Sequence, residues 1–170
     1  TRETDALSPT GLVGAADAVA LSGGSVFGLA AADGVAGVLA GRGRGFRLRS
    51  PEAPPAPIVP GAVVYDLMNG GDKGWGEHAP YRELGAAAAR AAGKRFELGT
   101  AGGGYGAVAG DLKGGLGSAS VVTVDGITVG ALAVVNCFGS VVGPDGSAFW
   151  AAPYELNREF GGADPAELVG

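Results

Sequence analysis

The sequence predicts an α+β protein in which helices lie outside β-sheets. The strongest indication is a pair of apolar runs, 121–124 and 127–135, separated by Asp125-Gly126. An Asp-Gly pair between β-branched runs is typical of a hairpin closed by a type I′ turn. A second indication is the order of the predicted elements, which is strand, helix, strand, strand, helix and then a run of strands. Because 127–135 is apolar on both faces, we expect that strand to be covered on both sides.

The first predicted elements are a strand and a helix joined by a glycine-rich turn. The apolar run 16–21 predicts the strand, and Ser25 is placed to cap a helix over 25–39. Gly34 and Gly37 within that helix indicate close contact with a neighbouring element. The Gly-Gly-Ser join between strand and helix either forms a tight turn or presents peptide N–H groups to an anion.

Two more strands and an Ala-rich helix follow. The strands are predicted at 46–49 and 62–67, and the helix at 81–92. The loop 69–79 between the second strand and the helix carries His78. Because His78 has no His or Cys close to it in sequence, we interpret it as a solvated loop residue and not as a metal ligand.

The segment 99–106, GTAGGGYG, is predicted to be a loop that brings the backbone close to a substrate or to a neighbouring strand. Gly102, Gly104 and Ala107 also match the G-x-G-x-x-A spacing of dinucleotide sites. A nucleotide-binding module is therefore one alternative function, although no strong buried strand directly precedes the motif. After the hairpin, 140–142 is predicted to be a strand and 143–146 a turn.

Length and composition limit the class of protein. The 170 residues correspond to a single domain, 1–170, with net charge −5 and no basic run, which argues against nucleic acid and membrane surfaces as partners. One Cys and one His argue against a disulfide framework and a zinc site, so no metal or cofactor is predicted. With no secretory signal and no long apolar stretch, we predict a cytoplasmic protein.

Four side chains at the ends of apolar segments are candidates for chemistry. Cys137 could be a nucleophile, but a lone Cys after an apolar strand is more often a small buried hydrophobe, and no base adjoins it in sequence. Tyr65, Lys113 and Asn136 are polar groups at the edges of apolar structure. Each also has a plain interpretation, as a half-buried Tyr, a surface Lys and a turn Asn, and their spacing does not show that they converge.

Six phrases, in order, resemble the self-processing aminopeptidase family of L-aminopeptidase/D-esterases, β-peptidyl aminopeptidases and nylon-oligomer hydrolases. They are TRETD (1–5), ALSGGSVFGLAAADGV (20–35), PIVPGAVVYDL (57–67), GTAGGGYGA (99–107), KGGLGSAS (113–120) and VGALAVVN (129–136). The resemblance implies a four-layer α/β/β/α sandwich similar to N-terminal-nucleophile hydrolases. It also implies an amide-bond hydrolase acting on short peptides or amino-acid amides.

The same resemblance implies roles for three residues. Family members use a Tyr from the Tyr-Asp strand, a Lys after the glycine-rich loop and an Asn that closes the later strand; Tyr65, Lys113 and Asn136 match these positions. Asp111 stands where some members carry the Lys. Family members also cut their own precursor before a Ser or Thr, which then acts as the nucleophile with its own α-amine as base.

The family's cleavage junction is expected after the Asn that Asn136 matches, and no such junction occurs before Gly170. We therefore expect this chain to be an interior fragment of the larger N-terminal part of the precursor, inactive alone. Its expected partners are the missing C-terminal segment that carries the nucleophile and further copies of itself, as a homo-oligomer. A catalytically inactive or structural scaffold domain is the alternative that the sequence leaves open.

Overall fold

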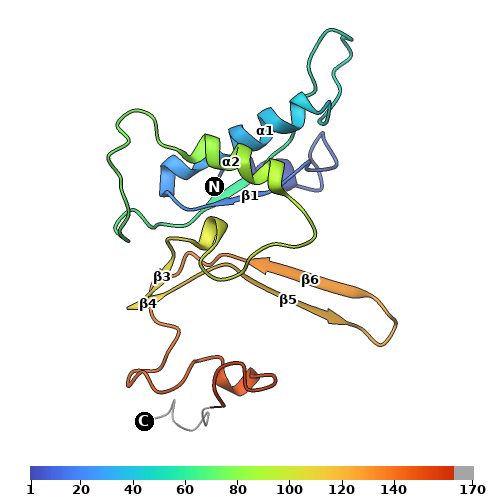
Figure 1. The fold of residues 1–170 in the computed structure, drawn as a ribbon. Coiled ribbons are helices and arrows are strands. Elements are labelled where there is room, and N and C mark those ends of the chain that lie inside the picture. The colour runs from blue at the N-terminus through green and yellow to red at the C-terminus, as the bar shows by residue number, and fades with distance from the viewer. Residues whose placement is uncertain (163–170) are drawn as a thin grey trace. The chain divides into compact units, whose positions relative to one another are not determined.

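The computed structural model describes residues 1–162, and its backbone divides into two compact units (Figure 1). The first unit comprises residues 1–107 and 114–136; the second comprises 108–113 and the chain from 137 onward. The helical elements and strands mix, as the α+β prediction requires. They are η1 (Thr4–Leu7), β1 (Ala20–Ser22), η2 (Ser25–Ala30), α1 (Ala31–Gly41), β2 (Gly61–Val63), α2 (Tyr81–Ala91), η3 (Gly102–Gly104), β3 (Val108–Ala109), β4 (Leu112–Lys113), β5 (Gly117–Val122), β6 (Thr128–Ala133) and η4 (Ala152–Tyr154).

The first unit is built on a parallel strand pair joined by a helical crossover. β1 and β2 pair in register, with Ala20 opposite Gly61 and Ser22 opposite Val63. The strands predicted at 16–21 and 62–67 therefore exist, but they are shorter. Before β1, the Asp17 carboxylate accepts a hydrogen bond from the Ile58 N–H, 2.9 Å, which takes the place of a ladder bond. Because β1 and β2 are parallel and in register, both strands end at the same edge, close to Gly23 and Val64.

The helix predicted over 25–39 begins differently from the prediction. Ser25 does not cap it: the N-cap is Gly24 in the left-handed region, and η2 is a 3-10 helix before α1 begins. Ser25 itself has φ of 52° and donates its N–H to the Val64 carbonyl, 3.1 Å. The join is thus drawn tightly onto the end of β2, and it holds Ser25 in a backbone conformation that is costly for a residue with a Cβ.

Helices α1 and α2 pack side by side, with glycine at the contact (Figure 1). A Cβ at Gly34 would overlap the Arg82 carbonyl oxygen, and one at Gly85 would overlap the Ala31 carbonyl oxygen. The close contact predicted for Gly34 is confirmed. The one predicted for Gly37 is wrong, because among residues 1–162 a Cβ added there would meet no atom of a neighbouring element within 4 Å. The core beneath α1 is formed by Ala20, Ala32, Leu39 and Val59.

The predicted hairpin is confirmed as β5 and β6, which pair antiparallel from Gly117 opposite Ala133 to Val122 opposite Thr128. Its turn differs from the type I′ prediction. The Gly126 N–H donates to the Thr123 carbonyl, 2.9 Å, and Gly126 alone in the turn has a positive φ, 80°. Val124 and Asp125 are therefore the central pair, followed by a left-handed glycine, which is the three-residue hairpin loop with a bulge.

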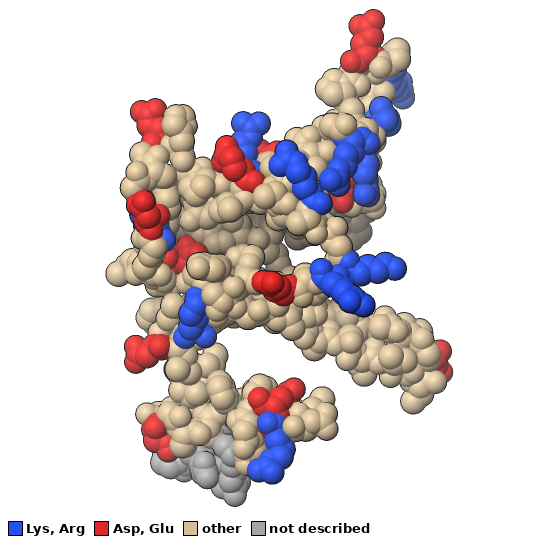
Figure 2. All heavy atoms as spheres, in the orientation of Figure 1, with Lys and Arg blue, Asp and Glu red and all other residues tan. Residues whose placement is uncertain are grey.

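The prediction that strand 127–135 is covered on both faces is wrong for residues 1–162. Every residue of β5 and β6 is exposed, because the hairpin pairs only with itself. In Figure 2 this ribbon is almost uniformly uncharged, apart from acidic atoms at its tip. The hairpin is thus an apolar element whose described neighbours leave it open to water.

Two weaker strand predictions are only partly realised. Segment 46–49 makes an isolated bridge between Phe46 and Ala56, and segment 140–142 one between Val142 and Phe149. The turn predicted at 143–146 is confirmed by the Gly146 N–H bond to the Gly143 carbonyl, 3.0 Å. In the second unit β3 and β4 form a two-residue antiparallel pair.

Candidate functional site

The candidate site lies where β1 and β2 end together. Parallel strands present their carboxyl ends at one edge of a sheet, where ligand sites of such sheets are usual. Gly23 and Gly24 follow β1, and Tyr65 and Asp66 follow β2. Tyr65 is exposed and Asp66 is buried, as expected when successive side chains of an extended segment point to opposite faces.

Asn136 reaches this edge through its side chain. Its Oδ1 accepts a hydrogen bond from the Tyr65 N–H, 2.8 Å, between residues 71 positions apart. A backbone N–H can only donate, so the amide atom facing it must be the oxygen, which fixes the orientation of the side chain. The Nδ2 group then points away from Tyr65 and remains a donor. The structure therefore brings together two of the three residues named from the sequence.

Lys113, the third of these residues, belongs to the second unit, where it ends β4 and pairs with Val108. Its side chain is exposed. The prediction that Lys113 converges with Tyr65 and Asn136 stays a prediction.

The glycine-rich segment 99–106 is used for backbone packing. A Cβ at Gly103 would lie 2.7 Å from the Leu21 carbonyl oxygen, so η3 lies directly on β1. Gly99 and Leu116 exchange two backbone hydrogen bonds of 2.8 Å at the start of the loop. The loop then leads into β3 and not into a helix, so it lacks the context that a dinucleotide motif requires.

Asp66 is a site residue that the sequence reasoning missed. It is 8% exposed, and its Oδ1 accepts a hydrogen bond from the Gly24 N–H, 2.7 Å. A Cβ at Gly23 or at Gly106 would collide with its Oδ2. The anion considered for the Gly-Gly-Ser join is therefore the chain's own carboxylate. An acidic residue inside the apolar run 62–67 is the signal that could have found it.

Three aromatic rings pack beside the turn between β1 and η2. Trp75, from the loop 69–79, packs edge-on against Phe27 and against Tyr81, with centroid distances of 5.9 and 5.8 Å. The Tyr81 ring lies on Gly24, where a Cβ would overlap it. Burial, and then the negative charge of Asp66, raise the pKa of the Tyr81 phenol above its ordinary value.

We expect the tyrosinate absorbance of Tyr81, obtained as the difference between the wild type and Tyr81→Phe, to rise at higher pH than that of an ordinary Tyr. The Asp66→Asn variant should move this titration down without normalising it, because burial is the larger cause of the raised pKa. A raised pKa in the folded state leaves stability undiminished below the ordinary Tyr pKa and lowers it as the pH rises further. A Tyr81 titration that Asp66→Asn leaves unmoved would contradict this placement of the carboxylate.

A comparison with known protein families identifies the family of this chain. The model of peptidase family S58 matches residues 1–155. The chain belongs to peptidase family S58. That membership confirms the resemblance drawn from the six sequence phrases.

Curated relatives agree with the S58 assignment. Uncharacterized aminopeptidase Rv1333 of Mycobacterium tuberculosis is 47% identical over 170 aligned residues, which cover 99% of this chain and 47% of the relative. Uncharacterized aminopeptidase Mb1368 of Mycobacterium bovis gives the same values. Uncharacterized aminopeptidase ML1167 of Mycobacterium leprae is 45% identical over 150 residues, covering 84% of this chain and 40% of the relative. The chain thus spans about half the length of the curated relatives it matches.

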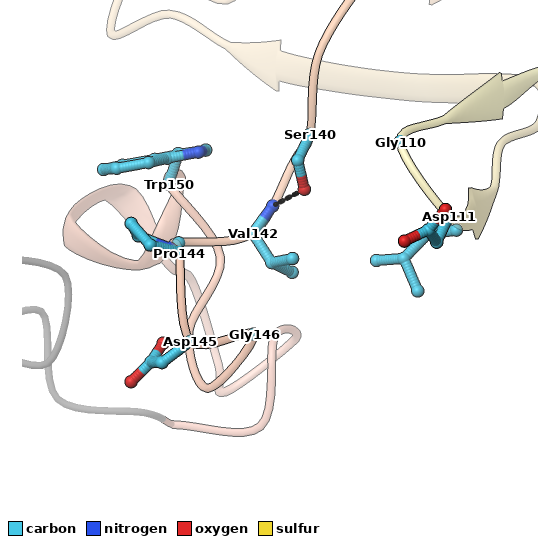
Figure 3. Close-up of a pocket in the computed structure, with 10 residues that line it drawn as sticks. Gly110, Asp111, Ser140, Val142, Pro144, Asp145, Gly146 and Trp150 are labelled. Atoms are coloured by element: carbon cyan, nitrogen blue, oxygen red, sulfur yellow. Dashed lines mark hydrogen bonds between the residues drawn. The ribbon is translucent and has the colours of Figure 1, made fainter.

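The second unit of this S58 chain carries a surface pocket of about 620 Å³ (Figure 3). Asp111, which the family resemblance made the alternative to Lys113, lines this pocket together with Trp150 and Asp145. Hydrogen bonds from the Ser147 N–H and hydroxyl hold the pKa of Asp145 below its ordinary value. The Asp145 carboxylate is therefore engaged by its own turn, and the pocket lies wholly within the second unit.

Cys137 departs from the sequence interpretation in its burial. It is exposed, not buried, and its Sγ lies 3.7 Å from the Val108 carbonyl oxygen.

Within residues 1–162, no group of three or more His, Cys, Asp and Glu side chains is arranged to hold a metal ion. In the same part of the chain, none of the helices has the length and apolar character needed to cross a membrane.

Proposed function

We propose that the protein containing this chain is an amide-bond hydrolase of the aminopeptidase type, acting on short peptides or amino-acid amides. The observation that carries the proposal is the hydrogen bond from the Tyr65 N–H to Asn136 Oδ1, which fixes the side-chain amide and leaves Asn136 Nδ2 as an oriented donor. Membership of peptidase family S58 supports the reaction class.

In the proposed mechanism the nucleophile is an N-terminal Ser or Thr that lies beyond this chain and is released by autoproteolysis. Its hydroxyl oxygen attacks the amide carbon, and its own α-amine takes the proton. Asn136 Nδ2 donates to the oxyanion that forms on the former carbonyl oxygen, and one such donor typically lowers the barrier by about 2.7–4 kcal/mol. The α-ammonium gives this proton to the leaving amine as the C–N bond breaks, and water then hydrolyses the resulting ester.

Tyr65 and Lys113 have supporting roles in this proposal. The Tyr65 hydroxyl shares the oxyanion or orients the nucleophile. A Lys ammonium near the site lowers the free energy of negative charge, and repulsion between like charges helps to keep the nucleophile's α-amine neutral. Lys113 takes this role if the second unit brings it to the edge, and Asp111 is the alternative occupant of its place.

The hairpin register supports the four-layer sandwich as the complete architecture. Directly opposed residues of an antiparallel pair share a face. The pairs Gly117–Ala133, Ala119–Ala131 and Val121–Val129 make one face entirely apolar, whereas the alternate pairs Ser118–Leu132, Ser120–Gly130 and Val122–Thr128 mix polar and apolar residues. Exposed apolar faces of this kind mark surfaces for packing. We propose that this face packs on a second sheet supplied by the rest of the protein.

The test is to express the full-length protein and to determine its chain masses and N-terminal sequences. We expect two chains, the second beginning with Ser or Thr, together with release of amine from amino-acid amides. Replacing that Ser or Thr with Ala should leave one uncut, inactive chain, whereas Cys137→Ala should be cut and active. An uncut and inactive wild type would favour the scaffold alternative, and a cut after Asn136 would promote Cys137 to nucleophile.

A further inference from the structure

Asp66 ties the end of β2 to two glycine-rich segments at once. Its Oδ1 binds the Gly24 N–H, and its Oδ2 lies against the Cα atoms of Gly23 and Gly106, where neither position leaves room for a Cβ. The carboxylate is thus enclosed by backbone from the β1–η2 join on one side and from the loop before β3 on the other.

Asn69 also holds the segment that follows β2 in place. Its N–H donates to the Asp66 carbonyl, 3.0 Å, which closes a turn over residues 66–69, and its Nδ2 donates to the Gly106 carbonyl, 2.8 Å. Asp66 and Asn69 therefore hold this turn against Gly24 and Gly106. Both are hydrogen-bonding side chains that act on backbone groups.

A buried carboxylate needs compensation, and here the backbone supplies it. Within residues 1–162 the Asp66 carboxylate is bonded by the Gly24 N–H and not by a Lys or Arg side chain. Gly24 is the N-cap of the continuous helical segment formed by η2 and α1. The positive end of a helix dipole stabilises a nearby negative group, so this placement favours the carboxylate.

Fixing Asp66 also affects Asn136, the proposed oxyanion donor, because the two residues are linked through the Tyr65 backbone. Asp66 directly follows Tyr65, whose N–H orients Asn136 through Oδ1. With Asp66 fixed on the buried side, the Tyr65 N–H has a defined direction on the exposed side. A shift of about 1 Å in a catalytic group can lower the rate by about 10²-fold, so the direction of this N–H matters for turnover.

We propose that Asp66, supported by Asn69, is a positioning residue of the site: it holds the Tyr65 backbone so that Asn136 Nδ2 faces the reacting carbonyl. The inference rests on the proposed function for its kinetic consequence. Its structural consequence, protection of the Tyr65 N–H, does not depend on activity.

The experiment compares Asp66→Ala, Asp66→Asn and Asn69→Ala in the full-length protein, with Asp72→Ala as the matched control. Asp72 is exposed in the neighbouring loop, and within residues 1–162 its side chain bonds only the nearby Gly74 N–H. The two readouts are kcat and KM on an amino-acid amide, and hydrogen exchange of the Tyr65 amide resolved by fragment mass spectrometry.

Asp66→Ala should lower kcat about tenfold to a hundredfold, leave KM within about threefold, and speed Tyr65 exchange about tenfold or more. Asp66→Asn retains an oxygen that can accept the Gly24 N–H and should stay within about threefold of the wild type in kcat. Asn69→Ala should lie between the two, and Asp72→Ala should be unchanged in both readouts.

Two results would overturn the inference: unchanged Tyr65 exchange and kcat in a folded Asp66→Ala or Asn69→Ala, or an Asp66→Asn variant as impaired as Asp66→Ala. If Asp66→Ala does not fold, Asp66→Asn and Asn69→Ala still decide. If the wild type shows no amidase activity, the proposed function fails, and hydrogen exchange alone decides the positioning role.

Discussion

Replacing Asn136 with Ala in the full-length protein is expected to lower turnover by about 10²–10³, the usual consequence of removing one oxyanion donor. The reason is the loss of Nδ2, which the bond between Oδ1 and the Tyr65 N–H orients. Asn136 is exposed, so water can take over the Tyr65 N–H and stability should change little. The measurement is kcat on an amino-acid amide, with the thermal midpoint as a check on folding.

Asn136→Asp separates the donor role from the structural one. It keeps an oxygen for the Tyr65 N–H but replaces the donor by an acceptor, so turnover should fall at least as far as in Asn136→Ala. Tyr65→Phe should cost less turnover, because the ring and the backbone N–H both remain. If Asn136→Asp kept most of the wild-type turnover, Asn136 would act only by holding Tyr65, and the proposed oxyanion role would be lost.

The hairpin shows how far local pattern carries a prediction of fold. The two runs around Asp125-Gly126 predict strands because the pairing is local and closed by a glycine that accepts a positive φ. The turn type could not be predicted, because either Asp125 or Gly126 alone can supply the left-handed residue, and the structure uses only Gly126. The exposure of β6 could not be predicted either, because it depends on which segments pack on the hairpin, and within residues 1–162 β5 and β6 pair only with each other.

The candidate site is predictable in part. Tyr65 and Asn136 are found through resemblance to a family, because a separation of 71 residues gives no local signal of contact. Asp66 escapes prediction because its importance comes from burial and from the Gly24 N–H, neither of which periodicity shows. Gly34 and Gly37 make the same point: both stand in one helix, yet only Gly34 meets a neighbour.

Gly34→Ala should destabilise the full-length protein by about 3 kcal/mol, the upper end of the usual effect of overpacking. The added methyl would overlap the Arg82 carbonyl oxygen and approach the Ala86 nitrogen, 2.7 Å. These are backbone atoms of α2 that cannot rotate away as a side chain would, so α1 and α2 must separate. Urea unfolding, followed by circular dichroism, measures the change in the free energy of unfolding.

Gly37→Ala in the same helix is the matched control and should stabilise by about 0.5–1 kcal/mol, because Ala is the better helix former and the position is open. Gly85→Ala, on the facing helix, should destabilise like Gly34→Ala, because its methyl would overlap the Ala31 carbonyl oxygen. Equal stability changes at 34 and 37 would mean that the helices do not touch at Gly34. The helical segment that contains Gly34 is capped by Gly24, whose N–H binds Asp66. Displacement of α1 by Gly34→Ala should therefore also speed hydrogen exchange of the Tyr65 amide. Gly37→Ala should leave this exchange unchanged.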